Sequence, residues 1–248
     1  MTTAAGTSDD GRANGRSGRI KQFAFWALVA AGFCLFIALG VWQLHRLAWK
    51  LDLIQTVNER VHAEAVDAPG PSAWPELSAT GDAYRHVRVT GQFTGAPPAF
   101  AQAVTRLGPG FWVLEPFRTD RGFIVLVNRG FVTGEEAKGL PKTSRAEVTM
   151  TGLLRITEPG GGFLRRNDPG ADRWYSRDVA AIAAARGLDD VAPYFIDADA
   201  SSERADVPVG GLTVVTFRNH HLIYALTWFG LAGMLAGWTI FLLRQRLK

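Results

Sequence analysis

Two small sets of side chains in this sequence have the types and spacing to bind a cofactor. In the set nearer the carboxyl end, His221, Tyr224, Ala225 and Trp228 recur at spacings of three, four and seven, which places them on one face of a helix. An imidazole nitrogen is a common metal ligand, and two aromatic rings beside a small residue leave room for a flat, apolar ring. This face is therefore a candidate cofactor site.

A matching set lies nearer the amino end, where Trp42, His45, Arg46 and Trp49 show the same spacing. An imidazole beside tryptophan and arginine suits a haem, because the iron accepts a histidine nitrogen and the propionates need a cation. A second interpretation stays open. Tryptophan and tyrosine gather at membrane interfaces, and arginine near the end of a span reaches the headgroups, whatever the function of the protein.

Each set lies at the end of a long uncharged run. Residues 23–44 and 222–243 contain no charged side chain, and each run has 22 residues, enough for the roughly 20 that a spanning helix needs. The alternatives are buried helices of a soluble protein or, for the first run, a cleaved signal peptide. The first run continues into Trp42-Gln43-Leu44-His45-Arg46 with no small-residue cleavage site. We therefore expect two retained membrane spans in contact with the lipid bilayer.

The basic residues indicate the orientation of these spans. The chain has 27 basic and 23 acidic residues; seven and two of them lie in segments 1–22 and 244–248, which leaves 20 and 21 elsewhere. The positive charge therefore indicates topology rather than nucleic-acid binding. We expect a disordered cytoplasmic tail (1–22), an outer domain (45–221), a cytoplasmic tail (244–248), and location in a bacterial cytoplasmic (inner) membrane.

The outer domain is expected to be α+β, with a β-rich, mostly antiparallel sheet forming a partly closed barrel. Residues 45–65 keep a helical pattern that extends the first span, and Asp178 to Arg186 predicts a short helix that ends at Gly187. The predicted strands span residues 86–90, 111–119, 123–132, 148–156, 193–197 and 212–217. Gly108-Pro-Gly110 is interpreted as a turn.

The sequence contains no nucleophile elbow, Walker loop, zinc-protease motif or dinucleotide fingerprint, so no enzyme activity is expected. The only cysteine, Cys34, lies inside the first span. Copper delivery uses clustered soft ligands, which this chain lacks. Gly230, Gly233 and Gly237 form a small-residue face, predicted to let the two spans approach each other or, alternatively, to contact another membrane protein.

Six motifs in order resemble the surfeit-locus cytochrome c oxidase assembly proteins, called Shy in yeast. They are Gly40-Val-Trp42-Gln43-x-x-Arg46-x-x-Trp49-Lys50, Tyr84-Arg85-x-Val87, Gly108-Pro-Gly110-Phe-Trp112, Val125-Leu-Val-Asn128-Arg129-Gly130, Asn167-Asp-Pro-x4-Trp174-Tyr175 and Phe217-x-Asn219-x-His221-Leu222-x-Tyr224-Ala225-x-Thr227-Trp228. The resemblance covers most of the chain, from about Gly40 to Trp228.

The resemblance implies a non-enzymatic assembly factor for haem–copper terminal oxidases. Such a protein would receive haem a from the haem a synthase and hand it to oxidase subunit I. The histidine of the family that is proposed to bind haem matches His221, so His221 is the expected ligand of the haem iron. The cofactor-binding set is then His221, His45, Tyr224, Trp228, Trp42 and Arg46.

This chain departs from the family pattern at two positions. His220 stands where a second asparagine is common, and His45 stands where glutamine or another residue is expected. Either histidine is a candidate second axial ligand. Two other functions stay open: a membrane b-type electron carrier with His45 and His221 as fixed ligands, and an exported binding module for an unrelated ligand. Two segments are interpreted as positions that dock a partner or fix the fold: Val125–Gly130 and Trp174-Tyr175. For Gly130, fixing the fold is the favoured role.

Overall fold

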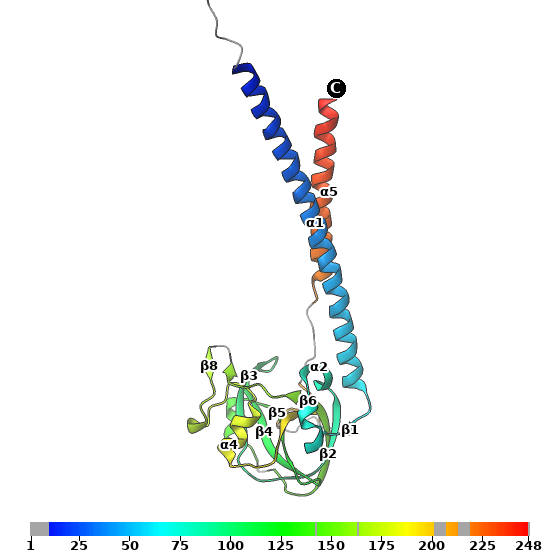
Figure 1. Cartoon of the computed structure of the whole chain (residues 1–248). Coiled ribbons are helices and arrows are strands. Elements are labelled where there is room, and N and C mark those ends of the chain that lie inside the picture. Colours follow the sequence, from blue (N-terminus) through cyan, green and yellow to red (C-terminus); the bar gives the residue numbers. More distant parts are fainter. Residues whose placement is uncertain (1–9, 142, 163, 201–206, 213–218, 248) are drawn as a thin grey trace, which may run out of the picture. The chain divides into compact units, whose positions relative to one another are not determined.

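The computed structural model describes residues 10–141, 143–162, 164–200, 207–212 and 219–247. The chain divides into two compact units. The first contains the helix α1 as far as Ile54 together with the helix α5, and the second begins at Gln55 and contains the strands. Figure 1 shows the elements of both units coloured along the sequence.

The first unit consists of two long helices, α1 (Asp10–His62) and α5 (His221–Arg246). Both are long and apolar enough to cross a membrane, with mean hydropathy of 2.4 and 1.7 in their most apolar windows. Only 6% of either window is buried, whereas the core helix of a soluble protein is mostly buried. The two apolar helices expected from the sequence are therefore present.

The bounds of α1 differ from the expected segments. The helix begins at Asp10, inside the stretch predicted as a disordered tail, and it runs through the predicted span and extension without a break. No proline interrupts residues 10–62, so the ladder of backbone hydrogen bonds continues. The helix ends at His62 rather than Ala65, because Val66 and Asp67 pair with β2 as the short strand β1 (Val66–Asp67).

The two helices contact each other through side chains that the glycine pattern does not predict. Phe36 stacks on Trp228 with ring centroids 5.8 Å apart, and a Cβ added at Gly40 would lie 2.5 Å from Cε1 of Phe229. Ala225 and Ala232 are buried. The pairing of Gly40 with a large ring on α5 is what allows this approach.

The predicted glycine face of α5 does not contact α1. A Cβ added at Gly230, Gly233 or Gly237 would meet no atom within 4 Å. The prediction that these glycines bring the two helices together is wrong, because the side of α5 that faces α1 carries Ala225, Trp228 and Phe229. The three glycines lie on another side of the helix. Contact of this face with another membrane protein stays a prediction.

Five strands of the second unit close into a barrel. Neighbouring strands follow the circuit β2–β6–β9–β5–β4, and pairing of β2 with β4 completes it. All pairs in the circuit are antiparallel except β5–β9. The strands are β2 (His86–Phe93), β4 (Gly108–Thr119), β5 (Ile124–Val132), β6 (Val148–Ile156) and β9 (Val191–Ala198). The mostly antiparallel, barrel-like sheet expected from the sequence is confirmed.

The barrel has apolar side chains on both sides of its central strands. Val125 and Val127 of β5 lie in one cluster with Phe117 and Ile196, while Leu126 lies in another cluster with residues of α4 (Val179–Arg186). A strand buried on both faces shows a continuous apolar run, which matches the sequence of β5. As predicted, α4 covers a sheet face; Asp178 caps its start, and Gly187 ends it at φ 61°.

Several short elements were not predicted. They are the edge strand β3 (Ala99–Thr105), β7 (Gly161–Gly162), β8 (Arg165–Arg166), α2 (Ala79–Asp82), α3 (Gly134–Lys138) and the 3-10 turns Pro71–Glu76 and Pro169–Ala171. Gly108-Pro-Gly110 begins β4 rather than forming the turn, which falls at Arg106 and Leu107. The predicted strand 212–217 lies outside the described residues except for Leu212, which is not in a strand.

Candidate functional site

The predicted ligand His221 is the first residue of α5, and its ring contacts one side chain of α1. Nδ1 of His221 lies 2.7 Å from Oε1 of Gln43. An amide oxygen only accepts hydrogen bonds, so Nδ1 of His221 carries the proton and donates it. In the neutral ring, Nε2 then keeps its lone pair, which is the state in which an imidazole binds a metal.

The pairing of His221 with Gln43 resembles the second shell of a metal site. A histidine that binds a metal through one nitrogen usually donates from the other to a carboxylate, carbonyl or water, which fixes the ring and raises its basicity. The ring of His221 is half-buried, so the contact orients it without enclosing it. The site around His221 thus provides one imidazole ligand whose tautomer is fixed by Gln43.

The face that His221 shares with Trp228 is partly covered by α1. Trp228 stacks on Phe36, and Ala225 is buried, so these two residues take part in helix packing. Only Tyr224 points outward, with 55% of its surface exposed. Binding of a flat ring by this face stays a prediction, and the contact of Trp228 with Phe36 leaves Tyr224 as its most exposed residue.

The second predicted set is spread around α1 and is largely exposed or paired within itself. Trp42 is 57% exposed, and the guanidinium of Arg46 lies over the ring of Trp49 at 3.9 Å. His45 is exposed and follows Gln43 by two residues, a rotation of about 200° around the helix. Since Gln43 is the residue that meets His221, the structure does not bring His45 together with His221.

Gln43 is a site residue outside the predicted cofactor-binding set. It lies inside the motif around Gly40 and Trp42, which carries part of the family resemblance. Gln43 is the only amide side chain within the first apolar run, and a polar side chain on such a helix is a candidate for a hydrogen bond to a neighbouring helix.

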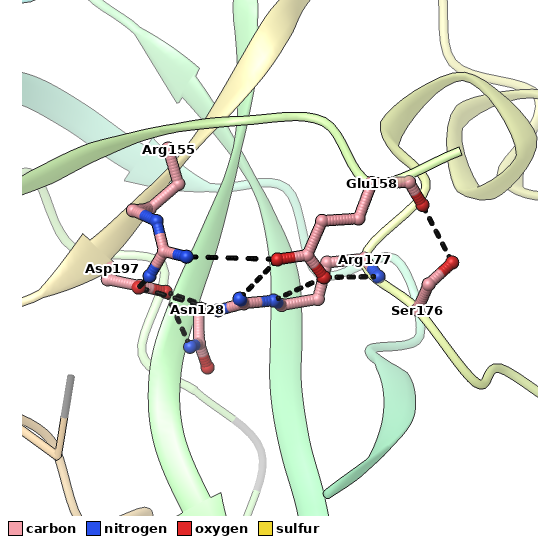
Figure 2. A network of polar contacts seen from close by, with 6 residues as sticks. All are labelled: Asn128, Arg155, Glu158, Ser176, Arg177 and Asp197. Carbon is pink, nitrogen blue, oxygen red and sulfur yellow. Dashed lines mark hydrogen bonds and ion pairs between the residues drawn. The ribbon is translucent and has the colours of Figure 1, made fainter. Parts of the chain in front are cut away.

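A second polar cluster lies on the barrel, outside the predicted set (Figure 2). The carboxylate of Asp197, 3% exposed, accepts hydrogen bonds from Asn128 at 2.7 Å, Arg155 at 2.7 Å and Arg177 at 3.1 Å. Glu158 binds Arg177 from the other side. The cluster joins the neighbouring strands β5, β6 and β9 to the segment before α4.

This cluster balances its own charges. Burial lowers the pKa of Arg177, but the hydrogen bonds and charges of Glu158 and Asp197 outweigh burial and raise the pKa above its ordinary value. The guanidinium therefore stays charged and paired. Two arginines with two carboxylates, all hydrogen-bonded, form a structural crosslink rather than a group poised for proton transfer.

The positions interpreted as docking or fold-fixing are built into the fold. Gly130 has φ 139°, and a Cβ there would lie 2.3 Å from the carbonyl oxygen of Val209. Trp174 is buried, and its Nε1 donates to Asp172. Only Tyr175 lines a surface groove. Among the described residues, no group of three or more His, Cys, Asp or Glu is placed to hold a metal ion.

Comparison with known proteins places this architecture in a family. A model described as the SURF1 family matches residues 30–233. Surfeit locus protein 1 of Rattus norvegicus is 36% identical over 226 residues, which cover 80% of this chain and 71% of the rat protein. The Homo sapiens protein of the same name is 35% identical over 234 residues, with 85% and 74% covered. A SURF1-like protein of Monosiga brevicollis is 31% identical over 241 residues, with 89% and 88% covered. The chain therefore belongs to the SURF1 family.

Proposed function

We propose that this protein is a membrane-anchored assembly factor for haem–copper terminal oxidases, which binds haem a through His221 and assists its insertion into subunit I. Membership in the SURF1 family supports the oxidase role. The observation that carries the haem proposal is the contact between Nδ1 of His221 and Oε1 of Gln43, which leaves Nε2 in the ligand state.

The residues around His221 fit a cargo that is held briefly. A single axial imidazole binds iron more weakly than two, so the haem can pass to a site that supplies more ligands. Tyr224 lies one turn beyond His221 and is more than half exposed, which offers a ring face to the porphyrin. When bound, haem a supplies the iron that the imidazole ligates. The residues of the chain hold and orient it.

The two apolar helices are proposed to span a bacterial cytoplasmic (inner) membrane with both termini in the cytoplasm. Their length, their hydropathy and the small part of each that is buried support two spans. The basic residues of the two tails support the orientation. The barrel domain then lies on the outer face, where haem a synthase and subunit I are its proposed partners.

The barrel is proposed to act in docking and in support, and not as an enzyme. Its buried carboxylates are engaged in ion pairs and hydrogen bonds, among them Asp197 with Arg155 and Glu115 with Arg129. A general base or nucleophile needs a group that is available to a substrate. The paired state of these carboxylates supports the non-enzymatic role.

The structure favours the assembly role over a b-type electron carrier. Such a carrier needs two axial ligands that face each other across the haem. His45 lies about 200° around the axis of α1 from Gln43, the residue that contacts His221. The other alternative, an exported binding module for an unrelated ligand, requires that haem has no part in the function of the protein.

Deleting the gene that encodes this protein tests the proposal. A strain without the gene, complemented with the parent, His221→Ala or His220→Ala, is grown under conditions that require the oxidase, and haem a and haem b are quantified in its membranes. We expect haem a in the oxidase to fall in the deletion strain and with His221→Ala, while His220→Ala restores it and other haem proteins stay intact. Normal haem a in the deletion strain, or loss of all haem proteins together, would contradict the proposal.

A further inference from the structure

The strand β3 ends the main sheet with one open edge. In the sheet order it follows β4, and within the described part of the chain it pairs with no other strand of the sheet. Part of its outer edge is covered, because Ala101 forms a bridge with Trp174, and the backbone N–H of Gln102 donates to the carbonyl of Trp174 at 2.8 Å. The covering chain then leaves the edge at Tyr175.

The backbone of Val104 lies just beyond this covered part. Val104 stands opposite Pro109 of β4, and proline has no N–H, so this pair is of the type without hydrogen bonds between the strands. The N–H and C=O of Val104 therefore point away from β4, on the same side as the N–H of Gln102. Among the described residues, no backbone group pairs with them. The side chain of Val104 is 85% exposed.

A groove runs along this open edge. It has a volume of about 580 Å³ and is lined by Val104, Phe111, Arg165 and Tyr175, among others. That volume falls in the range of sites that bind small ligands or short peptide segments. The guanidinium of Arg165 lies 5.4 Å from the centre of the Tyr175 ring, and its Nη1 donates to Oε1 of Gln102 at 3.2 Å. The hairpin of β7 and β8 thus forms the second wall.

The edge carries exposed apolar and positive side chains together. Leu107 and Leu164 are exposed, the second at 88%. Within the described part of the chain, Arg106, Arg165 and Arg166 form no ion pair, whereas nearby Arg173 is paired with Asp168 at 2.7 Å. Open edges in monomeric proteins are normally blocked, so an unblocked edge with apolar neighbours indicates a docking surface.

We propose that β3 accepts an extended segment of a partner protein as an additional strand, and that one face of this segment carries both apolar and acidic side chains. The main chain of the segment pairs with the N–H and C=O of Val104. Gln102 stands opposite Phe111 and accepts a hydrogen bond from Arg165, so Arg165 and Phe111 lie on the same face of the sheet. The face of the segment that covers the groove therefore places apolar side chains against Phe111 and Tyr175 and acidic side chains against Arg165. This inference concerns the barrel domain and does not depend on haem binding at His221.

The test measures binding of a labelled peptide in which valine and glutamate take turns at every second position, with threonine between them, so that one face of the strand carries both. The purified full chain in detergent is the receptor, and fluorescence polarisation is the readout. The same peptide with lysine in place of glutamate is the charge control. We expect the glutamate peptide to bind about tenfold more tightly than the lysine peptide, and Arg165→Glu to reverse this preference. Equal binding of the two peptides, or absence of binding by the glutamate peptide, would overturn the proposal.

Val104→Pro tests the backbone contact directly, because it removes only an N–H that faces away from β4. Proline is tolerated at such an outward position of an edge strand. We expect Val104→Pro to weaken peptide binding by about tenfold, whereas Val104→Ala, which keeps the N–H, weakens it much less. Circular dichroism checks that both variants stay folded. Unchanged affinity in a folded Val104→Pro variant would rule out strand addition.

A lipid surface is the competing occupant of this edge. A nitroxide attached to Leu164→Cys in a Cys34→Ser background, with the protein in lipid nanodiscs, distinguishes the two. For a protein-docking edge we expect the label to be accessible to an aqueous nickel chelate. A label shielded from nickel and exposed to oxygen would place the hairpin in the bilayer and overturn the proposal.

Discussion

Gln43 and His221 lie 178 positions apart in the sequence, and their side chains meet at 2.7 Å between Oε1 and Nδ1. The contact joins α1 to the first turn of α5 and fixes which nitrogen of the histidine carries the proton. The proposed haem site therefore depends on both helices, although only one of them carries the ligand.

Gln43→Leu should weaken haem a binding, because it removes the acceptor that orients His221 and keeps a side chain of similar size. Loss of such a second-shell contact typically costs about tenfold or more in affinity. Absorption spectra of the protein co-purified with haem a would measure it. Gln43→Glu, which keeps an acceptor, should retain binding, and Gln22→Leu on the exposed part of the same helix is the control. Equal haem content in Gln43→Leu and Gln22→Leu would refute the orienting role.

Gly40→Leu should separate the two helices, since even a Cβ at this position would lie 2.5 Å from the ring of Phe229. Nitroxides at the exposed positions Leu44 and Leu222, in a Cys34→Ser background, would report the distance by pulsed electron resonance. We expect a longer distance in Gly40→Leu and no change in Gly233→Leu, where a Cβ meets open space. The packing described for α1 and α5 would be wrong if the two variants behaved alike.

Gly130→Ala should destabilise the barrel by about 3 kcal/mol, because it adds backbone strain to a clash with the carbonyl of Val209. Chemical denaturation followed by circular dichroism would measure the free energy of unfolding. Gly134→Ala is the matched control, since its Cβ would meet no atom within 4 Å. A loss no larger than that of the control would contradict the fold-fixing role of Gly130.

Asp197→Asn should be costly, because two arginines of the buried cluster would lose their carboxylate. Breaking a buried ion pair by removing one partner costs about 3–5 kcal/mol. Asp67→Asn removes one side of an exposed pair with Arg88 and should cost about 1 kcal/mol or less. Denaturation of both variants under the same conditions would compare them, and similar losses would argue against a buried crosslink.

His86 should make the stability of the barrel depend on pH. Both ring nitrogens face acceptors, the carbonyl of Ala63 at 2.9 Å and the carboxylate of Asp199 at 2.8 Å, so the cationic ring satisfies both. Burial lowers the pKa of His86, but these hydrogen bonds and the charge of Asp199 raise it above 6.5. The folded state thus binds the proton more tightly than the unfolded state does.

The stabilisation by His86 is therefore complete below about pH 6.5 and is lost as the pH rises through the raised pKa of the folded state. We expect the free energy of unfolding of the parent to exceed that of His86→Gln by more at about pH 5.5 than at about pH 9. Denaturation curves at both values would measure it. A difference that grows toward alkaline pH would have the wrong sign.

Much of the fold could be predicted from local patterns. The hairpin of β4 and β5 follows from two apolar runs around Asp120-Arg121-Gly122, and α4 from its alanine-rich run and Gly187. The strand β3 was not predicted, because Ala99 to Thr105 lacks a clear alternation of apolar and polar residues. Its extended conformation depends on its pairing with β4. Closure between β2 and β4 is likewise a long-range property that no single segment encodes.

The candidate site was predictable only in part. His221 and its aromatic neighbours follow from helical spacing, but spacing does not say which side of one helix meets another. Spacing therefore did not predict that the partner of His221 is Gln43 rather than His45, or that Trp228 packs against Phe36 of the other helix. Likewise, the residues of the Asp197 cluster come from three strands and two loops, so no local motif in the sequence brings them together.

The central claim is that His221 holds haem a, and the haem content of the purified protein tests it most directly. The parent, His221→Ala and His220→Ala are each co-expressed with a haem a synthase, purified in detergent, and compared by absorption spectroscopy and pigment extraction. The account predicts haem a in the parent and in His220→Ala, and its loss in His221→Ala. As much haem a in folded His221→Ala as in the parent would contradict it.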